Sequence, residues 1–347
     1  MSLTILSVAY PLARVSPDST GGSEQILSAL DRALVAAGHR SIVIAPEGSR
    51  VAGDLVAIPW PDGLLDDPAK ARAQAANRDA IAGVLARSPV DLIHLHGIDF
   101  DRYLPAPGAP VLATLHLPPD WYPAGALRPT RPRTFFNCVS RSQHDACPPS
   151  PTLVDFIENG VPVGRLGASR HAKRDFALFL GRICPEKGVH LALQAAHRAG
   201  VPLIVAGELY DYAAHQAYFD AEVRPLLDEK CRYVGPVGFG RKRRLLTAAR
   251  CLLVPSLAAE TSSLVAREAA ACGTAVIAFP NGALADAVED GRSGFLVPDA
   301  EAMAKAIRRA AHISPETCRA LARERFDDGV MAVRYLDLYA ELARVAA

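Results

Sequence analysis

The chain has 347 residues, half of them hydrophobic, and its 38 Lys and Arg residues almost balance 37 Asp and Glu residues. The length indicates two domains, and a formal net charge of +1 excludes an overall field that would attract nucleic acid or an anionic membrane. Seven cysteines without a CxxC pair indicate free thiols, and the lack of a signal-peptide pattern or a long apolar run predicts a cytoplasmic protein without a membrane span.

Short apolar runs and helical patterns alternate through the first half of the chain. The run at residues 3–10 predicts a buried strand, and the segment 21–40 predicts a loop followed by a helix that ends at Gly38. Four more buried strands, separated by polar or Pro-rich loops, are predicted at SIVIA (41–45), DLIHLH (91–96), VLATLH (111–116) and TFFNCVS (134–140).

The same alternation begins again in the second half. Strands are predicted, with helical patterns between them, at FALFLGRI (176–183), PLIVAGE (202–208), CRYVGPV (231–237), CLLVPS (251–256), TAVIAF (274–279) and GFLV (294–297). Alternation of this kind indicates a parallel sheet covered on both faces. The fold class is therefore predicted as α/β, with two doubly wound, Rossmann-like domains whose ligands bind at the carboxyl ends of the strands.

The domain boundaries follow from this pattern. Residues 1–163 are expected to form the first domain and residues 176–328 the second, with GRLGASRHAKRD (164–175) as the linker. The final segment, 329–347, predicts a helix, because apolar side chains recur in it at helical spacing. These side chains are Met331, Tyr335, Leu338, Tyr339 and Leu342.

One segment, LLVPSLAAETSSLVAREAAACGTAVIAF at residues 252–279, holds Glu260 and Glu268 in an apolar setting. Its first part predicts a strand and its middle a helix, with Ser262 or Ser263 as the N-cap. Free backbone amides and the helix dipole make that helix start an anion site. Glu268 could then accept hydrogen bonds from both hydroxyls of a ribose, with a diphosphate near the helix start. The alternative is that Glu260 favours the helix dipole and Glu268 lies on the surface.

This segment resembles the Glu-x7-Glu signature of glycosyltransferase family 4, whose members are retaining enzymes of the GT-B fold. Further motifs in the family's order are TGGSE (20–24), HLHG, TLH, CVSRSQ and NGV in the first half, and LGRICPEKGV (180–189), VAGE (205–208), RYVGPV (232–237) and ACGTAVIAFPNGALADAVEDGRSGFLV (271–297) in the second. The resemblance spans nearly the whole chain. It implies two sheets facing a central cleft, an acceptor-binding first domain, a donor-binding second domain and a last helix that crosses back to the first.

The resemblance also implies roles for single residues. Glu268 would hold the donor ribose, and Glu260 the hydroxyls of the donor sugar. Arg182 and Lys187 would bind the diphosphate. The alternative is that both lie on a solvated loop without a ligand, although two cations at a helix start favour an anionic partner. His116 would reach the sugar at the reaction centre. Further donor contacts are implied for Gly21 and Gly22, for Val237 through its backbone, and for Ser262, Ser263 and Leu264 at the helix start.

Two positions depart from the family pattern. Members often carry Pro-Phe-Gly after the first glutamate, whereas this chain has Thr261, Ser262 and Ser263. Backbone amides at that place touch the donor sugar, so the identity of the sugar is left open. In addition, GELYD replaces a commoner Gly-x-Gly, so Glu208 is expected to alter the nucleotide pocket.

The function expected from these observations is metal-independent, retaining transfer of a hexose-like sugar from a nucleotide-diphosphate sugar to an acceptor hydroxyl, with no cofactor. The acceptor could be a saccharide, a lipid-linked molecule or a small molecule, and nucleic acid is not expected as a partner. A related GT-B enzyme that hydrolyses or epimerises a nucleotide sugar, and a non-catalytic sugar-nucleotide binder, are the alternatives. A dehydrogenase is discarded, because no G-x-G-x-x-G directly follows a predicted strand.

A pair of histidines and an acidic run are the two candidate metal sites in the sequence. His94 and His96 project from one face of a strand, but no Cys or third His has suitable local spacing, so a place at the edge of the cleft is favoured over a metal site. The run DFD, Asp99 to Asp101, imitates the Asp-x-Asp of metal-dependent GT-A enzymes. It follows a strand of the wrong fold class, so coincidence is favoured.

Two segments are candidate sites for contact with a membrane or with the acceptor. RKRR, at 241–244, is typical of a solvated helix face, with peripheral contact to an anionic membrane or acceptor as the alternative. The Pro-rich segment 117–133 carries Trp121 and Tyr122. These rings either stack on an acceptor sugar or pack the loop.

Overall fold

A computed structural model describes residues 2–61, 66–168 and 171–344. The chain forms two compact units, Met1–Asn159 with Gly329–Ala347, and Gly160–Asp328. The units therefore divide after Asn159, and the predicted linker, 164–175, lies within the second unit. Residues 169–170 of that linker, residues 1 and 62–65 of the predicted first domain, and residues 345–347 of the predicted last helix lie outside the described residues.

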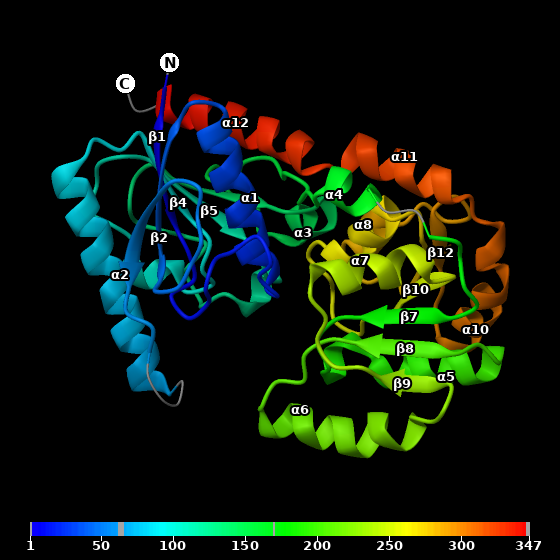
Figure 1. Ribbon diagram of the computed structural model, residues 1–347. Coiled ribbons are helices and arrows are strands. Elements are labelled where there is room, and N and C mark those ends of the chain that lie inside the picture. The colour runs from blue at the N-terminus through cyan, green and yellow to red at the C-terminus, as the bar shows by residue number, and fades with distance from the viewer. Residues whose placement is uncertain (1, 62–65, 169–170, 345–347) are drawn as a thin grey trace. The chain divides into compact units, whose positions relative to one another are not determined.

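The first unit is a six-stranded parallel sheet in the order β3-β2-β1-β4-β5-β6, with helices on both faces (Figure 1). Its strands are β1 (Thr4–Val8), β2 (Arg40–Pro46), β3 (Asp54–Ile58), β4 (Leu92–Leu95), β5 (Val111–Leu115) and β6 (Thr134–Cys138). Its helices are α1 (Gly22–Ala36), α2 (Asp67–Arg87), α3 (Arg141–Ala146), α12 (Asp328–Arg344) and the 3-10 turns η1 (Phe100–Tyr103) and η2 (Pro119–Trp121).

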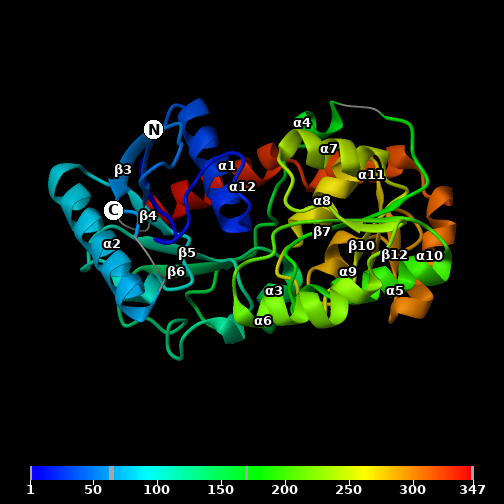
Figure 2. The same cartoon turned by 60° about the horizontal axis from the view of Figure 1, so that its bottom comes forward.

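The second unit repeats this arrangement in the order β12-β11-β10-β7-β8-β9. Figure 2 shows helices on both sides of this sheet. Its strands are β7 (Ala177–Leu180), β8 (Leu203–Ala206), β9 (Cys231–Tyr233), β10 (Cys251–Val254), β11 (Ala275–Ala278) and β12 (Gly294–Leu296). Its helices are α4 (Val163–Gly167), α5 (Val189–Ala199), α6 (Ala213–Tyr218), α7 (Phe239–Ala248), α8 (Leu264–Ala271), α9 (Leu284–Ala287), α10 (Ala300–Arg309) and α11 (Pro315–Arg325), with short turns η3 (Pro185–Lys187), η4 (Phe219–Val223), η5 (Arg224–Leu226) and η6 (Ala310–His312).

The predicted fold class is thereby confirmed, with two doubly wound parallel sheets. Strands β4, β5, β10 and β11 are buried along their whole length. Continuous apolar runs are expected where helices cover both faces of a parallel sheet. Each unit encloses its own hydrophobic core around these strands.

The sequence pattern missed β3 and α2. β3 is an edge strand, largely exposed until Ile58, so it has no buried apolar run to reveal it. α2 buries mainly small side chains, among them Ala69 and Ala73, together with Ile81 and Val84. Its contact face is therefore poorly marked by hydrophobicity, although Asp66 caps its N-terminus by accepting from the Ala69 amide at 2.8 Å.

Helix α12 packs onto the sheet of the first unit through tyrosine hydroxyls as well as apolar contacts. Tyr335 Oη accepts from Asn137 Nδ2 at 3.0 Å and lies 3.3 Å from Thr114 Oγ1. Tyr339 Oη lies 2.7 Å from His94 Nδ1. All five side chains are buried, so these hydrogen bonds satisfy polar groups that would otherwise be costly inside the unit.

The first and last residues of the second unit, near 160 and 328, lie side by side. Val161 pairs with Asp327 in a parallel bridge, and the Val161 amide donates to the Phe326 carbonyl at 2.8 Å. A Cβ on Gly160 would lie 2.5 Å from the Asp328 Cα. Glycine is therefore required at this close approach.

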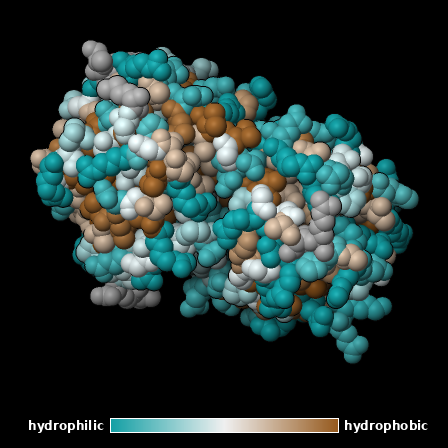
Figure 3. Space-filling model, turned by 45° about the horizontal axis from the view of Figure 1, so that its top comes forward, coloured by the Kyte–Doolittle hydropathy of each residue, from teal (hydrophilic) through white to brown (hydrophobic). Residues whose placement is uncertain are grey.

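The surface and the thiols are ordinary for a globular protein. Figure 3 shows hydrophilic residues over most of the face drawn, with hydrophobic residues in smaller groups among them. All seven cysteines are buried free thiols, as predicted. Among the residues that the structure describes, no helix combines the length and the apolar character needed to span a bilayer.

Candidate functional site

The candidate site of the second unit lies where its strand order reverses, at the carboxyl ends of the neighbouring strands β7 and β10. Arg182 and Lys187 follow β7, and Glu260 follows β10. The Leu257 amide donates to the Glu186 carbonyl at 2.8 Å, which joins the two loops directly. Ligands of doubly wound sheets bind at such a switch point.

A glycine fixes the packing of these two loops. Gly188, which separates η3 from α5, has φ +63°, and a Cβ there would lie 2.2 Å from the Pro255 carbonyl oxygen. Both the left-handed backbone and the close approach exclude other residues. The G of the PEKG motif therefore sets Lys187 against the loop that carries Glu260.

Lys187 and Glu260 are paired with each other. Lys187 Nζ donates to Glu260 Oε1 at 2.5 Å, and Ser256 Oγ donates to the same oxygen at 2.5 Å. The two side chains of the ion pair are 25% and 12% exposed, so the pair is shielded but accessible. The backbone of Glu260 is also held, because the Ala283 amide donates to its carbonyl at 2.7 Å.

Glu268 is buried, so its alternative interpretation as a surface residue is wrong. It lies inside α8 with 2% exposure, and Lys242 Nζ donates to its Oε1. A buried carboxylate needs such a partner, because leaving it unpaired costs several kcal/mol, about 3–5 by mutation. Glu268 and Lys242 together therefore form a second shielded ion pair in this unit.

Lys242 was missed by the sequence reasoning, which placed all of RKRR on a solvated helix face. Arg241 and Arg244 are indeed exposed. Lys242 instead turns to Glu268, and Arg243 Nη1 donates to the Arg165 carbonyl at 3.1 Å. The spacing could have indicated this difference. Arg241 and Arg244 are three positions apart and share one face of the helix, so the two residues between them face another side.

Ser263 occupies the N-cap position of α8 but does not cap it. Its backbone has φ +52°, and its side chain makes no capping hydrogen bond. The hydroxyls of Ser262 and Ser263 are both buried and have no hydrogen-bond partner among the described residues. The predicted N-cap position is therefore confirmed at Ser263, but the capping hydrogen bond expected of a serine is absent. The backbone of Ser263 keeps the left-handed conformation that glycine prefers, which explains why glycine is common at this place in the family pattern.

The remaining sequence-predicted residues of this unit lie on nearby loops. Arg182 is exposed after β7, Val237 is half-buried between β9 and α7, and Leu264 is the first residue of α8. The Glu208 carbonyl accepts from the Ile183 amide at 2.9 Å, so GELYD lies beside the loop of Arg182. A Cβ on Gly207 would lie 1.7 Å from the Gly181 carbonyl oxygen, which requires glycine there.

In the first unit, Gly21 and Gly22 begin α1, as the N-cap and the first helical residue. A Cβ on Gly21 would lie 1.8 Å from Glu24 Oε2. Glu24 is buried, which raises its pKa, and Ser23 Oγ donates to its Oε1 at 2.9 Å. Gly21 therefore makes room for a buried carboxyl group, a role that the sequence reasoning did not assign to it.

His116 follows β5, as predicted. Its Nε2 lies 3.0 Å from His96 Nδ1, and its backbone amide donates to Tyr122 Oη at 2.9 Å. Burial lowers the pKa of His116 to about 4, so its ring is neutral at pH 7. Tyr122 thus packs the Pro-rich loop and fixes the backbone of His116, whereas Trp121 is 46% exposed.

The prediction that His94 lies at the edge of a cleft is wrong. This residue is fully buried between Tyr339 and Thr114, whose Oγ1 lies 2.6 Å from His94 Nε2. Burial lowers the pKa of both His94 and His96 well below the usual value. His94 is therefore a core residue that anchors α12.

Asp99 of the DFD run is a structural residue. It accepts from Gln74 Nε2 at 2.8 Å and from Tyr103 Oη at 2.9 Å. Burial raises the pKa of its carboxyl group. Neither Asp99 nor Asp101 joins a group of three potential metal ligands among the residues described.

Comparison with known protein families accounts for both units. A model described as Glycosyl transferases group 1 matches residues 174–312, and one described as Glycosyltransferase Family 4 matches residues 20–163. The chain belongs to the family 4 type of glycosyltransferases. The fold is GT-B, the fold of structural neighbours that cover the whole of this glycosyltransferase-family chain.

Curated relatives of this glycosyltransferase family match parts of the chain. The D-inositol 3-phosphate glycosyltransferase of Saccharomonospora viridis is 32% identical over 221 residues, which cover 55% of this chain and 51% of that protein. The enzyme of the same name from Mycobacterium tuberculosis (strain ATCC 25177 / H37Ra) is 37% identical over 163 residues, which cover 42% of this chain and 33% of that protein. The chain thus spans about half or less of the length of these curated relatives.

Solved structures match the whole chain. AviGT4, a glycosyltransferase involved in avilamycin A biosynthesis, is 26% identical with a TM-score of 0.75, and the match covers 99% of both chains. Anabaena HepE in complex with UDP-glucose is 17% identical with a TM-score of 0.74, and the match covers 98% of this chain and 100% of HepE. The second likeness shows the fold alone.

Proposed function

We propose that this protein is a retaining glycosyltransferase, which transfers a sugar from a nucleotide-diphosphate sugar to an acceptor hydroxyl without a divalent metal. The observation that carries the proposal is the shielded Lys187–Glu260 contact at the switch point of the second unit, together with the buried Lys242–Glu268 contact between α7 and α8. AviGT4 and the curated relatives are glycosyltransferases by name, and HepE binds UDP-glucose. These likenesses support a nucleotide sugar as the donor.

The donor would engage each ion pair differently. The carboxylate of Glu268 accepts from the two ribose hydroxyls, while Glu260 accepts from hydroxyls of the sugar. The diphosphate lies against Arg182, Lys187 and the amides at the start of α8, where the helix dipole favours an anion. The ammonium of Lys187 then exchanges part of its contact with Glu260 for a phosphate oxygen.

The chemistry requires stabilisation of the departing diphosphate. As the bond between the anomeric carbon and the phosphate oxygen breaks, negative charge grows on the diphosphate, and the bond from the anomeric carbon to the acceptor oxygen forms. A unit charge about 4 Å from an ammonium gains roughly 4 kcal/mol at an effective dielectric near 20. That corresponds to about three orders of magnitude in rate, so Arg182 and Lys187 can take the place of a metal.

Retention follows if the acceptor attacks from the face that the diphosphate leaves. The proton of the acceptor hydroxyl passes to an oxygen of the departing phosphate, so atoms and charge balance without a protein nucleophile. Glu260 is committed to Lys187 and Ser256 through Oε1. Its role in this scheme is to orient the sugar.

The proposal is tested by donor screening followed by a transfer assay. Nucleoside diphosphates and their sugars are screened by thermal shift, since a ligand at one hundred times its dissociation constant stabilises a protein by about 2.7 kcal/mol. The best donor is then incubated with candidate acceptors, and the anomeric configuration of the product is determined by NMR. Inverted product would refute retention, and release of free sugar at the same rate without acceptor would indicate a hydrolase.

Metal independence is tested in the same assay. Transfer should continue in excess EDTA, and Lys187→Ala should reduce turnover far more than Asp101→Ala. Asp99→Ala is a less clean control, because Asp99 holds Gln74 and Tyr103. Loss of activity in EDTA that magnesium or manganese restores, together with loss in Asp101→Ala, would contradict the proposed mechanism.

A further inference from the structure

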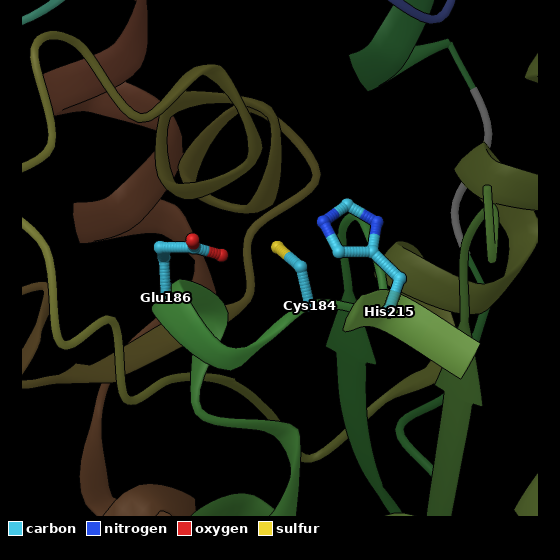
Figure 4. A group of neighbouring side chains, drawn as sticks. All are labelled: Cys184, Glu186 and His215. Carbon is cyan, nitrogen blue, oxygen red and sulfur yellow. The ribbon is translucent and has the colours of Figure 1, made fainter. Parts of the chain in front are cut away.

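A sulfur, a nitrogen and a carboxylate oxygen converge beside the loop of Arg182 and Lys187. They belong to Cys184 and Glu186, which follow β7, and to His215 of α6. Figure 4 shows the Cys184 thiol between the Glu186 carboxylate and the His215 ring. The three potential ligand atoms all lie within 4.8 Å of one another.

The three side chains are positioned by their own contacts, and Cys184 Sγ also donates to the Arg182 carbonyl oxygen at 3.9 Å. The His215 ring is held edge-on to Tyr212, with centroids 5.1 Å apart, and the ring nitrogen that faces the Cys184 thiol in Figure 4 is Nε2. The Cys184 thiol is buried, which raises its pKa, while Glu186 is exposed yet turns its carboxylate toward the thiol. The group therefore brings together a thiol, an imidazole and a carboxylate, and thiolate and imidazole are ligands that suit Zn²⁺.

We propose that Cys184, Glu186 and His215 bind a thiophilic divalent cation of the Zn²⁺ class. One sulfur, one imidazole nitrogen and one carboxylate oxygen are all ligands that Zn²⁺ accepts at about 2.0–2.3 Å. Tetrahedral coordination at these lengths separates the ligands by roughly 3.5 Å, so the atoms would have to approach by about 1 Å at most. The exposed side chain of Glu186 is free to make most of this movement.

Charge also favours the cation. Coordination requires the thiolate, so the Cys184 proton is released to solvent as the metal binds. The thiolate and the Glu186 carboxylate then neutralise the two positive charges, and neutral His215 supplies the third ligand. Three protein ligands leave a fourth tetrahedral position for water, as in open zinc sites.

The site would tether the loop rather than supply a catalytic metal, so removal of the cation by EDTA should still leave sugar transfer possible. Cys184 and Glu186 lie between Arg182 and Lys187 in sequence, and His215 belongs to a separate helix, α6. A bound cation would therefore tie this loop to α6. The inference does not depend on the transferase activity, because metal binding can be measured without donor or acceptor.

The experiment uses the full chain without a histidine tag. Zn²⁺ affinity is measured by competition with a chromogenic chelator, and Co²⁺ is added separately to look for thiolate-to-metal charge-transfer absorption. Wild type should bind one Zn²⁺ and show the Co²⁺ band. Cys184→Ser should lose the band, and Cys184→Ser, Glu186→Gln and His215→Gln should each weaken Zn²⁺ binding at least tenfold.

Two variants serve as matched controls. Cys231→Ser removes another buried thiol of the second unit, and His197→Gln removes a histidine whose Nδ1 lies 3.8 Å from Asp228. Both should bind Zn²⁺ as wild type does. Thermal unfolding without metal checks that each variant is folded, and Zn²⁺ should raise the midpoint of wild type but not of His215→Gln.

Several results would overturn the proposal. These are wild-type affinity in all three ligand variants, equal loss in the two controls, or a Co²⁺ spectrum without the thiolate band. Hydrogen exchange gives an independent readout, since Zn²⁺ should slow exchange of the amides in 183–189 and leave the first unit unchanged. Unaltered exchange in that segment at saturating Zn²⁺ would equally refute the site.

Discussion

Replacing Ser263 should stabilise the protein and at the same time slow its reaction. The residue has φ +52° and a buried hydroxyl that has no hydrogen-bond partner in the described part of the chain. A non-glycine residue in the left-handed region costs about 1–2 kcal/mol, and a buried, unsatisfied hydroxyl costs about 1–3 kcal/mol. We propose that the donor sugar is what this hydroxyl contacts, so its cost is retained for function.

Two substitutions separate the two contributions. Ser263→Ala removes the hydroxyl and keeps the strained backbone, so it should stabilise by about 1 kcal/mol. Ser263→Gly also relieves the backbone, although the extra freedom of glycine in the unfolded chain returns about 0.5–1 kcal/mol. We expect a total near 2 kcal/mol for Ser263→Gly, which raises the unfolding midpoint by roughly 4–8 °C in a unit of this size.

The assay combines unfolding with kinetics. Both tryptophans, Trp60 and Trp121, lie in the first unit, so their fluorescence reports that unit, whereas circular dichroism follows both. Arg133→Gly is the control, because Arg133 has φ 53° in the first unit and no assigned role in the site. Both Ser263 variants should lose several-fold in kcat/KM for the donor, equivalent to a hydrogen bond of about 0.5–1.5 kcal/mol, and Arg133→Gly should not.

The order of stabilities decides the argument. If Ser263→Ala is less stable than wild type, the hydroxyl has a protein partner and the reasoning about burial fails. If Ser263→Gly is no more stable than Ser263→Ala, the backbone at this position is not strained. Normal donor kinetics in both variants would remove Ser263 from the donor site.

Four further predictions concern charged or titratable side chains. Glu268→Ala should weaken binding of the nucleoside diphosphate by roughly 1.5–3 kcal/mol, measured by titration calorimetry, and unchanged affinity in the folded variant would refute the ribose assignment. Lys242→Met should destabilise the fold, because it leaves Glu268 buried and unpaired. His116→Ala should leave nucleotide affinity unchanged and lower turnover by a factor equivalent to about 2.7–4 kcal/mol, and near-normal turnover would make His116 structural. Because burial lowers the pKa of His116 to about 4, and that of His94 and His96 well below 6.5, the unfolded chain binds more protons below pH 6.5. Stability of the first unit should therefore be full above pH 6.5 and fall toward pH 4, and urea unfolding of His116→Gln, followed by tryptophan fluorescence, should show a slope shallower by up to about 1.4 kcal/mol per pH unit.

The sequence predicted the doubly wound sheets because buried parallel strands leave continuous apolar runs. The same rule could not reveal β3, whose residues from Asp54 to Ala57 are partly or fully exposed at the sheet edge. Gly188 lies within a motif that was recognised in the sequence. Glycine is required there because its backbone lies against Pro255, which is 67 positions further along the chain, and this approach is visible only in three dimensions.

The pairing of the site residues was also beyond the sequence. Glu260 and Glu268 were recognised as unusual carboxylates in an apolar segment. Their partners were not, because Lys187 was assigned to a diphosphate and Lys242 lay among surface cations. Spacing along one helix predicts neighbours on that helix, whereas each of these contacts joins different elements.

The buried hydroxyls of Tyr335 and Tyr339 have a consequence for synthesis of the protein. Translation delivers residues 160–328, a complete compact unit, before the ribosome has made the helix on which His94 and Thr114 depend. The unit that begins the chain is thus the last to become complete. Until α12 has been made and has docked, His94 and Asn137 lack their tyrosine partners, so the nascent first unit should depend on a chaperone for longer than the second.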